Sequence, residues 1–485
     1  MRQTVSFPID DPAFWRKQLL YWAAGFEQGV YLDNNTLILG RAVETSEVFE
    51  DLRGLHRPPQ NQSWECLAAA DPVDLLEVNT GNAFEQLGDF IQHTNDWLFG
   101  FLGYDLKNEV EDLASQNYDG IGLPDLGFFR PGTVASIKPY SFLESPRIAY
   151  VLEIQTLDRA PEEVFEDIKT AAPDPRFGDK ETFVPEKITL QPRISKADYL
   201  QTVEAIRQHI AGGDIYEMNF CQEFFAENAC IEPVAVFERL NEIGKAPFTT
   251  FLRWRDRYLL SASPERFLKK EGQKLTTQPI KGTRRRGKSP EEDEIIRQEL
   301  AASEKDRSEN VMIVDLVRND FSRNCLPGSV VVEELCAIYS FATVHQMIST
   351  VSGILPKYPY PIDHIDHIQP IDHINPIDHI PLNALRDCFP MGSMTGAPKV
   401  MAMELIERYE RTRRGMYSGA VGYFAPDGNF DFNVVIRSIL YNAASHYVSA
   451  QVGGAIVYDS VPEQEYEECM VKSEAMMRAL AGTAS

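Results

Sequence analysis

The chain has little of three things: paired cysteines, long apolar runs and positive charge. Its seven cysteines are scattered, with no Cys-x-x-Cys pair, which favours reduced thiols over a disulfide framework. No apolar run approaches the ~18 residues of a membrane-spanning helix, and the first residues lack the basic start and apolar core of a signal peptide. The sequence therefore predicts a cytoplasmic protein that does not enter a membrane.

Positive charge is the third scarcity. Lysine and arginine together number 47 against 72 aspartates and glutamates, which gives a formal net charge of −25. A nucleic-acid partner is not expected, since phosphate backbones need lysine and arginine to neutralise them. The same charge repels small anions at long range, so an anionic substrate must meet local cations or a bound metal.

The chain, at 485 residues, has room for two or three domains. Residues 1–185 mix short strand-like runs with polar helices and are predicted to form an N-terminal α+β domain. A proline-rich stretch over residues 171–192 is the predicted linker. Residues 190–485, opening with a helix capped by Ser195, are predicted to form one large α+β catalytic domain. Strands are expected at residues 147–155, 258–262, 418–424 and 432–436.

One segment, residues 361–381, is unlike the rest of the chain and is predicted to be a low-complexity insert. Two interpretations stay open: a metal-binding tract, or a repeat expansion in a surface loop whose prolines prevent a regular helix. The unit Ile-Asp-His-Ile occurs there four times, and the segment holds four of the nine histidines, namely His364, His367, His373 and His379.

Two groups of charged residues have the spacing of a single helix face. Glu465, Glu468 and Lys472 lie at i, i+3 and i+7, and Asp306 and Glu309 lie at i and i+3. Taken alone, either group fits a solvated charged face. If the two helices faced each other, their carboxylates would form an oxygen-only site of the kind that suits Mg²⁺.

Lys281 lies in a predicted strand and turn, followed by a run of arginines at residues 284–286. The glycine after it, Gly282, permits a close approach of the backbone to a ligand. A lysine becomes a nucleophile only when it is neutral, which burial can arrange by lowering its pKa. The alternative is an exposed turn lysine in a basic run.

The chain resembles the chorismate-utilising enzymes: anthranilate synthase component I, aminodeoxychorismate synthase component I, and the isochorismate and salicylate synthases. The resemblance covers about residues 195–480, interrupted by the insert, and continues weakly into residues 101–107. The motifs that carry it are residues 213–219 (GDIYEMN), 263–265 (SPE), 279–283 (PIKGT), 305–310 (KDRSEN), 315–320 (DLVRND), 392–399 (GSMTGAPK), 417–419 (YSG), 436–438 (IRS) and 453–455 (GGA).

The resemblance implies an α+β fold like that of anthranilate synthase component I, with large antiparallel sheets in a sandwich core flanked by helices. The residue between Pro-Ile and Gly-Thr sorts the chemistry within the family. Anthranilate synthases typically carry alanine there, whereas aminodeoxychorismate synthases commonly carry lysine, as this chain does at Lys281. The position that holds a lysine base in isochorismate synthases is Glu217 here, and aminating relatives usually have glutamine at that place.

By this resemblance the chain aminates chorismate to 4-amino-4-deoxychorismate, on the route to 4-aminobenzoate and folate. Lys281 adds to the ring as a covalent catalyst, and Glu265 is the general acid on the departing hydroxyl. Mg²⁺ is expected on Glu309 and Glu468, supported by Asp306 and Glu465. Substrate contacts are expected from Arg437, Tyr417, Gly419, Gly453, Gly454, Lys472, His345, Gly282, Thr283 and Thr395. Each has a structural alternative: Glu265 as a turn cap, Arg437 in an ion pair, and the two threonines as turn hydroxyls.

The ammonia is expected to come from a separate glutaminase subunit, because none of the seven cysteines lies in the Gly-x-Cys-x-Gly setting of a glutaminase nucleophile. The nearest alternative function is anthranilate synthase component I. A second is a non-catalytic metal-binding protein on the same fold, with the histidine tract as its working part.

Overall fold

A computed structural model of the chain describes residues 2–35, 64–141, 148–173, 188–356 and 380–482. All four histidines of the Ile-Asp-His-Ile insert, and most of the predicted linker, lie outside these residues. None of the described helices combines the length and the apolar character needed to cross a bilayer.

Two antiparallel sheets share the long strand β5 (Leu126–Ser141). The first residues of β5 pair with β4, as Phe99 does with Phe129, and its later residues pair with β6, as Thr133 does with Thr156. Over most of its length the other edge of β5 pairs with β3. The sheets therefore diverge from one strand pair and stack on each other.

The first sheet runs through β1 (Gln3–Ile9), β6 (Ile148–Thr156), β5, β3 (Cys66–Val78), β2 (Gln28–Asp33), β9 (Phe248–Trp254), β10 (Arg257–Ser263), β19 (Ser438–Asn442), β20 (Tyr447–Ile456) and β8 (Glu217–Ala226), with β7 (Gln191–Pro192) and β16 (Gly396–Ala397) on the edge of β8. The second runs through β5, β4 (Leu98–Leu102), β17 (Ala420–Phe424), β18 (Phe430–Val434), β11 (Arg266–Glu271), β12 (Lys274–Gln278) and β15 (Val344–Ile354), with β13 (Ile280–Arg285) and β14 (Val331–Ser340) also paired to β15.

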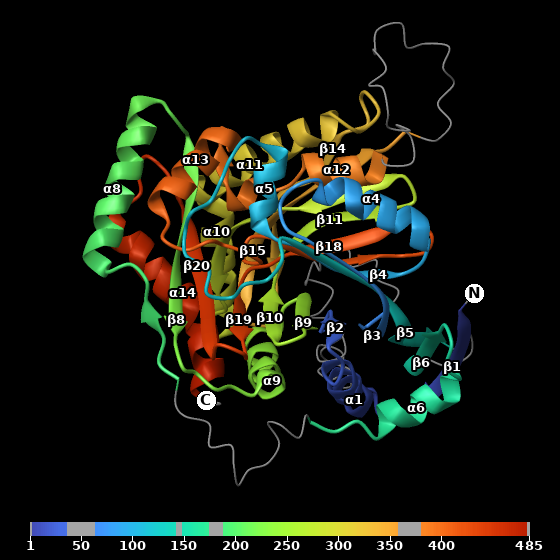
Figure 1. Ribbon diagram of the computed structural model, residues 1–485. Helices are drawn as coiled ribbons and strands as arrows, with labels where there is room; N and C mark the ends of the chain where they lie inside the picture. The colour runs from blue at the N-terminus through green and yellow to red at the C-terminus, as the bar shows by residue number, and fades with distance from the viewer. Residues whose placement is uncertain (1, 36–63, 142–147, 174–187, 357–379, 483–485) are drawn as a thin grey trace, which may run out of the picture.

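Helices cover the outer face of each sheet (Figure 1). Those on the first sheet are α1 (Pro12–Ala24), α6 (Pro161–Lys169), α8 (Lys196–Gly212), α9 (Pro233–Gly244) and α14 (Pro462–Ala481). Those near the second are α4 (Ala83–Thr94), α10 (Pro290–Ala302), α11 (Glu304–Ser322) and α12 (Ile380–Asp387), and the remaining pieces are η3 (Tyr104–Leu106), α5 (Lys107–Val110), η5 (Gly392–Met394) and α13 (Lys399–Tyr409).

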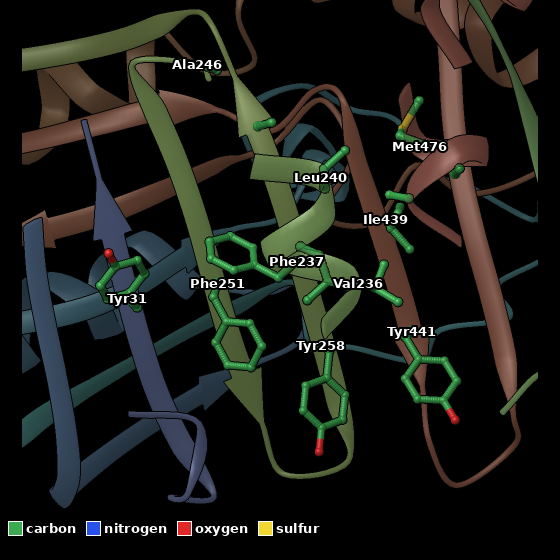
Figure 2. Packing of buried hydrophobic residues seen from close by; sticks show 14 of the residues in the cluster. Tyr31, Val236, Phe237, Leu240, Ala246, Phe251, Tyr258, Ile439, Tyr441 and Met476 are labelled. Atoms are coloured by element: carbon green, nitrogen blue, oxygen red, sulfur yellow. The ribbon is translucent and has the colours of Figure 1, made fainter. Parts of the chain in front are cut away.

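Helix α9 illustrates how the helices pack on the first sheet. Its Val236, Phe237 and Leu240 recur at helical spacing and are buried. Figure 2 shows them over Phe251 and Tyr258 of the neighbouring strands β9 and β10. A separate apolar cluster fills the space between the two sheets, with members from β2, β4, β9 and β17.

This is the predicted α+β architecture of antiparallel sheets in a sandwich flanked by helices. The segment before residue 185 is joined to the rest by hydrogen-bonded strands, because β2 pairs with β9 and β4 with β17. The N-terminal strands therefore complete both sheets of the segment that carries the chemistry. The predicted division at residues 185–190 stays a prediction.

Candidate active site

Lys281 and Glu217 meet where the far edges of the two sheets come together. Lys281 belongs to β13 of the second sheet and Glu217 to β8 of the first. The Lys281 Nζ lies 2.6 Å from the Glu217 Oε1, and the side chains are 9% and 1% exposed. Lys281 is therefore not the exposed turn lysine that its arginine-rich neighbourhood allowed.

The charge on Lys281 is set by two opposing effects. Burial lowers the pKa of the ammonium, but attraction to Glu217, and after it to Glu309 and Glu265, outweighs burial and leaves the pKa raised. Lys281 is thus an ammonium ion in this arrangement. The expectation of a neutral amine was wrong here, because Glu217 supplies a buried counter-charge that a glutamine would not.

Glu265 follows β10 and is 5% exposed. The Ser393 hydroxyl donates to the Glu265 Oε1 at 2.7 Å and fixes the carboxyl group. Burial raises the pKa of Glu265 to about 7, and the hydrogen bond from Ser393 and the charge on Lys281 only partly oppose it. Near neutral pH much of this group carries a proton and can donate it.

The two acidic helices predicted to face each other do so. α11 begins after Ser303, whose hydroxyl accepts from the Asp306 backbone N–H. The Lys305 Nζ lies 3.9 Å from the Glu309 Oε1 of α11 and 3.5 Å from the Glu465 Oε1 of α14. The Lys305 ammonium therefore lies between a carboxylate of α11 and a carboxylate of α14.

Gly454 of β20 lies directly beside the carboxylates of α14. A Cβ atom on Gly454 would lie 3.4 Å from both the Glu465 Oε2 and the Glu468 Oε1. The Lys472 Nζ pairs with the Glu468 Oε1 at 2.7 Å and donates to the Gly453 carbonyl oxygen at 2.7 Å. Both predicted glycines therefore lie directly under the acidic residues of α14.

These carboxylates have one feature expected of a divalent-cation site, a buried oxygen that no described residue hydrogen-bonds. They also have one that is not expected, a lysine between them. The Glu309 Oε1 is buried without a hydrogen-bond partner among the described residues, and burial raises the pKa of Glu309 to about 7. No three acidic, histidine or cysteine side chains of the described chain already surround one point. Lys305 lies between these carboxylates instead, and its side chain is 53% exposed. If Lys305 moved out, the oxygens of Glu309, Glu465 and Glu468 would be of the type that a divalent cation prefers.

Asp306 does not join this group. Its Oδ2 accepts from the Arg284 guanidinium at 2.7 Å, and its side chain packs against Gly282, where a Cβ would lie 2.9 Å from Asp306 Cβ. Gly282 has a φ of +82°, so glycine is required there on both counts. Asp306 thus supports this turn, in which the Thr283 carbonyl accepts from Arg284, and its support of a metal, directly or through water, stays a prediction.

Arg437 is a partly buried cation directly before β19. Burial lowers the pKa of its guanidinium, with Tyr417 and Glu468 opposing the shift. No ion pair or hydrogen bond of that guanidinium is found within the described residues, so the structural alternative of an ion-paired arginine is not realised. The buried Tyr417 hydroxyl accepts from the Cys221 thiol at 3.7 Å. Gly419 lets this segment approach the Leu102 carbonyl, which a Cβ would meet at 2.2 Å.

Two residues predicted to line the site are committed elsewhere. The His345 ring is fully buried between the Asp293 carboxylate, at 3.0 Å from Nε2, and the Ser340 hydroxyl, at 2.8 Å from Nδ1. The Thr395 hydroxyl donates within its own turn to the carbonyl oxygen of Met391 at 3.2 Å. Both side chains thus stabilise local structure, as the turn-hydroxyl alternative held for Thr395.

Sequence reasoning missed three residues of the site: Glu217 as the partner of Lys281, Ser393 on Glu265, and Lys305 between the acids. Ser393 and Lys305 stand inside motifs that the resemblance singled out. Glu217 was noticed as a departure from the family pattern, without a role.

The chain is similar to several known proteins. Anthranilate synthase component 1 of Thermus thermophilus is 34% identical over 391 residues, which span 79% of this chain and 76% of that protein. Aminodeoxychorismate synthase component 1 of Salmonella typhimurium is 35% identical over 392 residues, with the same shares of 79% and 76%. The solved structure of anthranilate synthase component I from Streptococcus pneumoniae superposes with a TM-score of 0.68 at 24% identity, over 90% of this chain and 98% of that one. At this identity the likeness shows the fold alone.

The family of chorismate binding enzymes matches residues 30–478 of the chain. That range includes every side chain described above as part of the site. The chain therefore belongs to this family and is a chorismate-utilising enzyme.

Proposed function

We propose that the enzyme aminates chorismate to 4-amino-4-deoxychorismate, the precursor of 4-aminobenzoate and folate. The observation that carries the proposal is the buried Lys281, held between Glu217 at 2.6 Å and a Glu265 whose pKa burial raises to about 7. A lysine and a protonatable carboxyl group are thus buried close enough to interact electrostatically. Addition of a nucleophile with departure of a hydroxyl group needs these two functions together.

The substrate is a dianion, and the chain has a net charge of −25, so local cations must bind it. Arg437 suits the enolpyruvyl carboxylate, because a planar guanidinium donates two parallel hydrogen bonds and this one has no competing partner within the described residues. Tyr417 and the backbone at Gly453 and Gly454 complete that end of the site.

Glu309, Glu465 and Glu468 are the residues that would hold Mg²⁺. When bound, the ion supplies the compact positive charge that the ring carboxylate of chorismate needs. Lys305 must leave its place between Glu309 and Glu465 for this, and its exposed side chain permits it.

In the reaction that we propose, Glu265 donates its proton to the 4-hydroxyl group while the neutral amine of Lys281 adds to C2 of the ring. Water leaves and a covalent enzyme intermediate forms. Ammonia then attacks C4, the Lys281 amine departs from C2, and 4-amino-4-deoxychorismate is released. Ser393 keeps Glu265 oriented throughout through its 2.7 Å hydrogen bond.

The ammonia is proposed to come from a separate glutaminase subunit. The seven cysteines of the chain lack the setting of a glutaminase nucleophile, and six of them are buried. Only Cys230 is exposed.

The alternative activity is that of anthranilate synthase component I, a name borne by relatives of comparable identity. Lys281 favours amination at C4, because it occupies the position where anthranilate synthases typically carry alanine. Incubation of the enzyme with chorismate, Mg²⁺ and ammonium, followed by mass spectrometry, is expected to yield 4-amino-4-deoxychorismate. Fluorescent anthranilate as the main product would contradict the proposal, and no turnover of chorismate would favour the non-catalytic alternative.

Glu468→Gln tests the proposed metal site. The change removes one of the three ligand charges and the ion pair to Lys472, so we expect the Mg²⁺ concentration for half-maximal rate to rise by roughly 10-fold or more. The measurement is a titration of rate against Mg²⁺ at saturating chorismate. Glu467→Gln is the matched control, because Glu467 is a neighbouring glutamate of α14 whose side chain is 66% exposed. An unchanged titration for Glu468→Gln would exclude Glu468 as a ligand.

A further inference from the structure

The unusual feature of this site is the state of the Glu217 carboxylate. One of its oxygens, Oε1, contacts the Lys281 ammonium at 2.6 Å. The other, Oε2, is buried and has no hydrogen-bond partner among the residues that the structure describes. A buried carboxylate usually satisfies both oxygens, since leaving one without a partner costs free energy. Glu217 therefore has one carboxylate oxygen in contact with the Lys281 ammonium and one that no described residue contacts.

Several carboxylates face the Lys281 ammonium. Lys281 is faced by Glu309 of α11, by Glu265 ahead of β11 and by Glu468 of α14, besides Glu217 itself. Glu217 and Glu309 also repel each other. Lys305 and Lys472 pair with Glu309 and Glu468 in turn. The carboxylate in direct contact with Lys281 is that of Glu217, so a proton that leaves the lysine has an acceptor at 2.6 Å.

We propose that Glu217 is the base that takes the proton of the Lys281 ammonium and thereby generates the nucleophilic amine. This inference rests on the proposed function, in which Lys281 forms a covalent intermediate. The usual glutamine at this position can orient a lysine but cannot accept its proton. Lys281 is held as an ammonium ion and must become neutral before it can add to the ring. Glu217 can accept that proton directly, without solvent.

The steps balance in protons and in bonds. The Lys281 ammonium gives one proton to Glu217, leaving a neutral amine and a glutamic acid. The amine forms its bond to C2 as the C4–O bond breaks, and Glu265 protonates the departing hydroxyl to water. Ammonia bonds to C4 as the C2–N bond breaks, and the released Lys281 amine recovers its proton from Glu217. The product ammonium returns a proton to Glu265.

Glu217→Gln is the decisive variant, because it keeps the size of the side chain and its hydrogen bond but removes the proton acceptor. At saturating Mg²⁺ and ammonia we expect kcat to fall by roughly 10²-fold or more, with the KM for chorismate changed by less than about 3-fold. Glu223→Gln is the matched control. Glu223 is another buried glutamate of β8, with partners in Arg193 and Tyr447 rather than in the site, and its replacement should leave kcat near the wild-type value.

The pH dependence separates a base from a merely structural residue. In the wild type the Lys281 proton is transferred internally, so the rate is expected to be level below pH ~7 and to fall above it as Glu265 ionises. In Glu217→Gln the lysine must lose its proton to solvent. Its rate should therefore rise by about 10-fold per pH unit below pH ~7 and become level above it.

Glu217→Asp supplies the rescue, because it restores a proton acceptor with a shorter reach, and we expect it to recover at least roughly a tenth of the wild-type rate together with the wild-type pH profile. A Glu217→Gln enzyme with the wild-type rate and profile would overturn the role of Glu217. If Lys281→Ala were fully active, or if the wild type made no 4-amino-4-deoxychorismate, the proposed function itself would fail, and the role of Glu217 with it. Should Glu217→Gln not fold, a Glu217→Asp enzyme whose rate below pH 7 rises with pH would overturn it equally.

Discussion

Lys281→Ala is expected to lower the rate of 4-amino-4-deoxychorismate formation by roughly 10³-fold or more, because it removes the covalent catalyst rather than a binding contact. The cavity left at position 281 is next to Glu265, which keeps its ability to protonate the 4-hydroxyl. Ammonia can then add directly at C2, so the residual product should be the 2-amino isomer. Mass spectrometry and chromatography of the products from chorismate and ammonium measure both effects.

The variant also removes the cation that neutralises Glu217, and a buried carboxylate without its partner costs about 3–5 kcal/mol. The double variant Lys281→Ala/Glu217→Gln is therefore the appropriate control, since it removes both charges and should restore thermal stability without restoring activity. Intact-protein mass spectrometry of the wild type with chorismate and no ammonia should show an adduct that both variants lack. Full activity of Lys281→Ala would rule out covalent catalysis by this lysine.

The sequence predicted the fold well wherever a pattern is local. The strands expected at residues 258–262 and 418–424 are β10 and β17, and Ser195 caps α8 by accepting from the Asp198 backbone N–H. Alternation and capping depend only on near neighbours, so one chain segment suffices to see them. What no local pattern contains is that β4 pairs with β17 across more than three hundred residues of chain.

The site divides in the same way. Helical spacing placed Glu465, Glu468 and Lys472 on one face correctly, because the spacing is a property of the helix itself. The same spacing could not show that Asp306 pairs with Arg284, because Arg284 reaches it from another element. His345 failed for a related reason: its partner Asp293 is 52 residues away in the sequence.

The contact between Glu217 and Lys281 was the least accessible to prediction. The two residues are 64 positions apart and lie on different sheets, and their distance depends on the register of both. Seen from the sequence, burial of Lys281 suggests a lowered pKa and a neutral amine. In the structure Glu217, together with Glu309 and Glu265, outweighs burial and leaves the pKa raised. A side chain from one motif thus changes the protonation state of a residue in another, 64 positions away.

Glu265→Gln is the second variant with a large expected effect. Glutamine preserves the hydrogen bond from Ser393 but has no proton for the departing hydroxyl, so we expect kcat to fall by about 10²- to 10⁴-fold. The fall in rate above pH ~7 that we expect for the wild type should also vanish, because that limb would report the ionisation of Glu265. Steady-state rates from pH 6 to 9 measure both, with Glu271→Gln, an exposed glutamate at the end of β11, as the control.

The same substitution should stabilise the fold in a pH-dependent manner. Glu265 ionises near pH 4.5 when unfolded and near pH 7 when folded, so its contribution to stability declines as the pH rises from about 4.5 to about 7 and is level above that. The full decline corresponds to roughly 3 kcal/mol. Glu265→Gln removes it, and its melting temperature relative to the wild type should therefore increase between pH 5 and pH 8. A variant that loses activity without this gain would show that Glu265 is ionised in the folded enzyme, and a general acid would have to be sought elsewhere in the site.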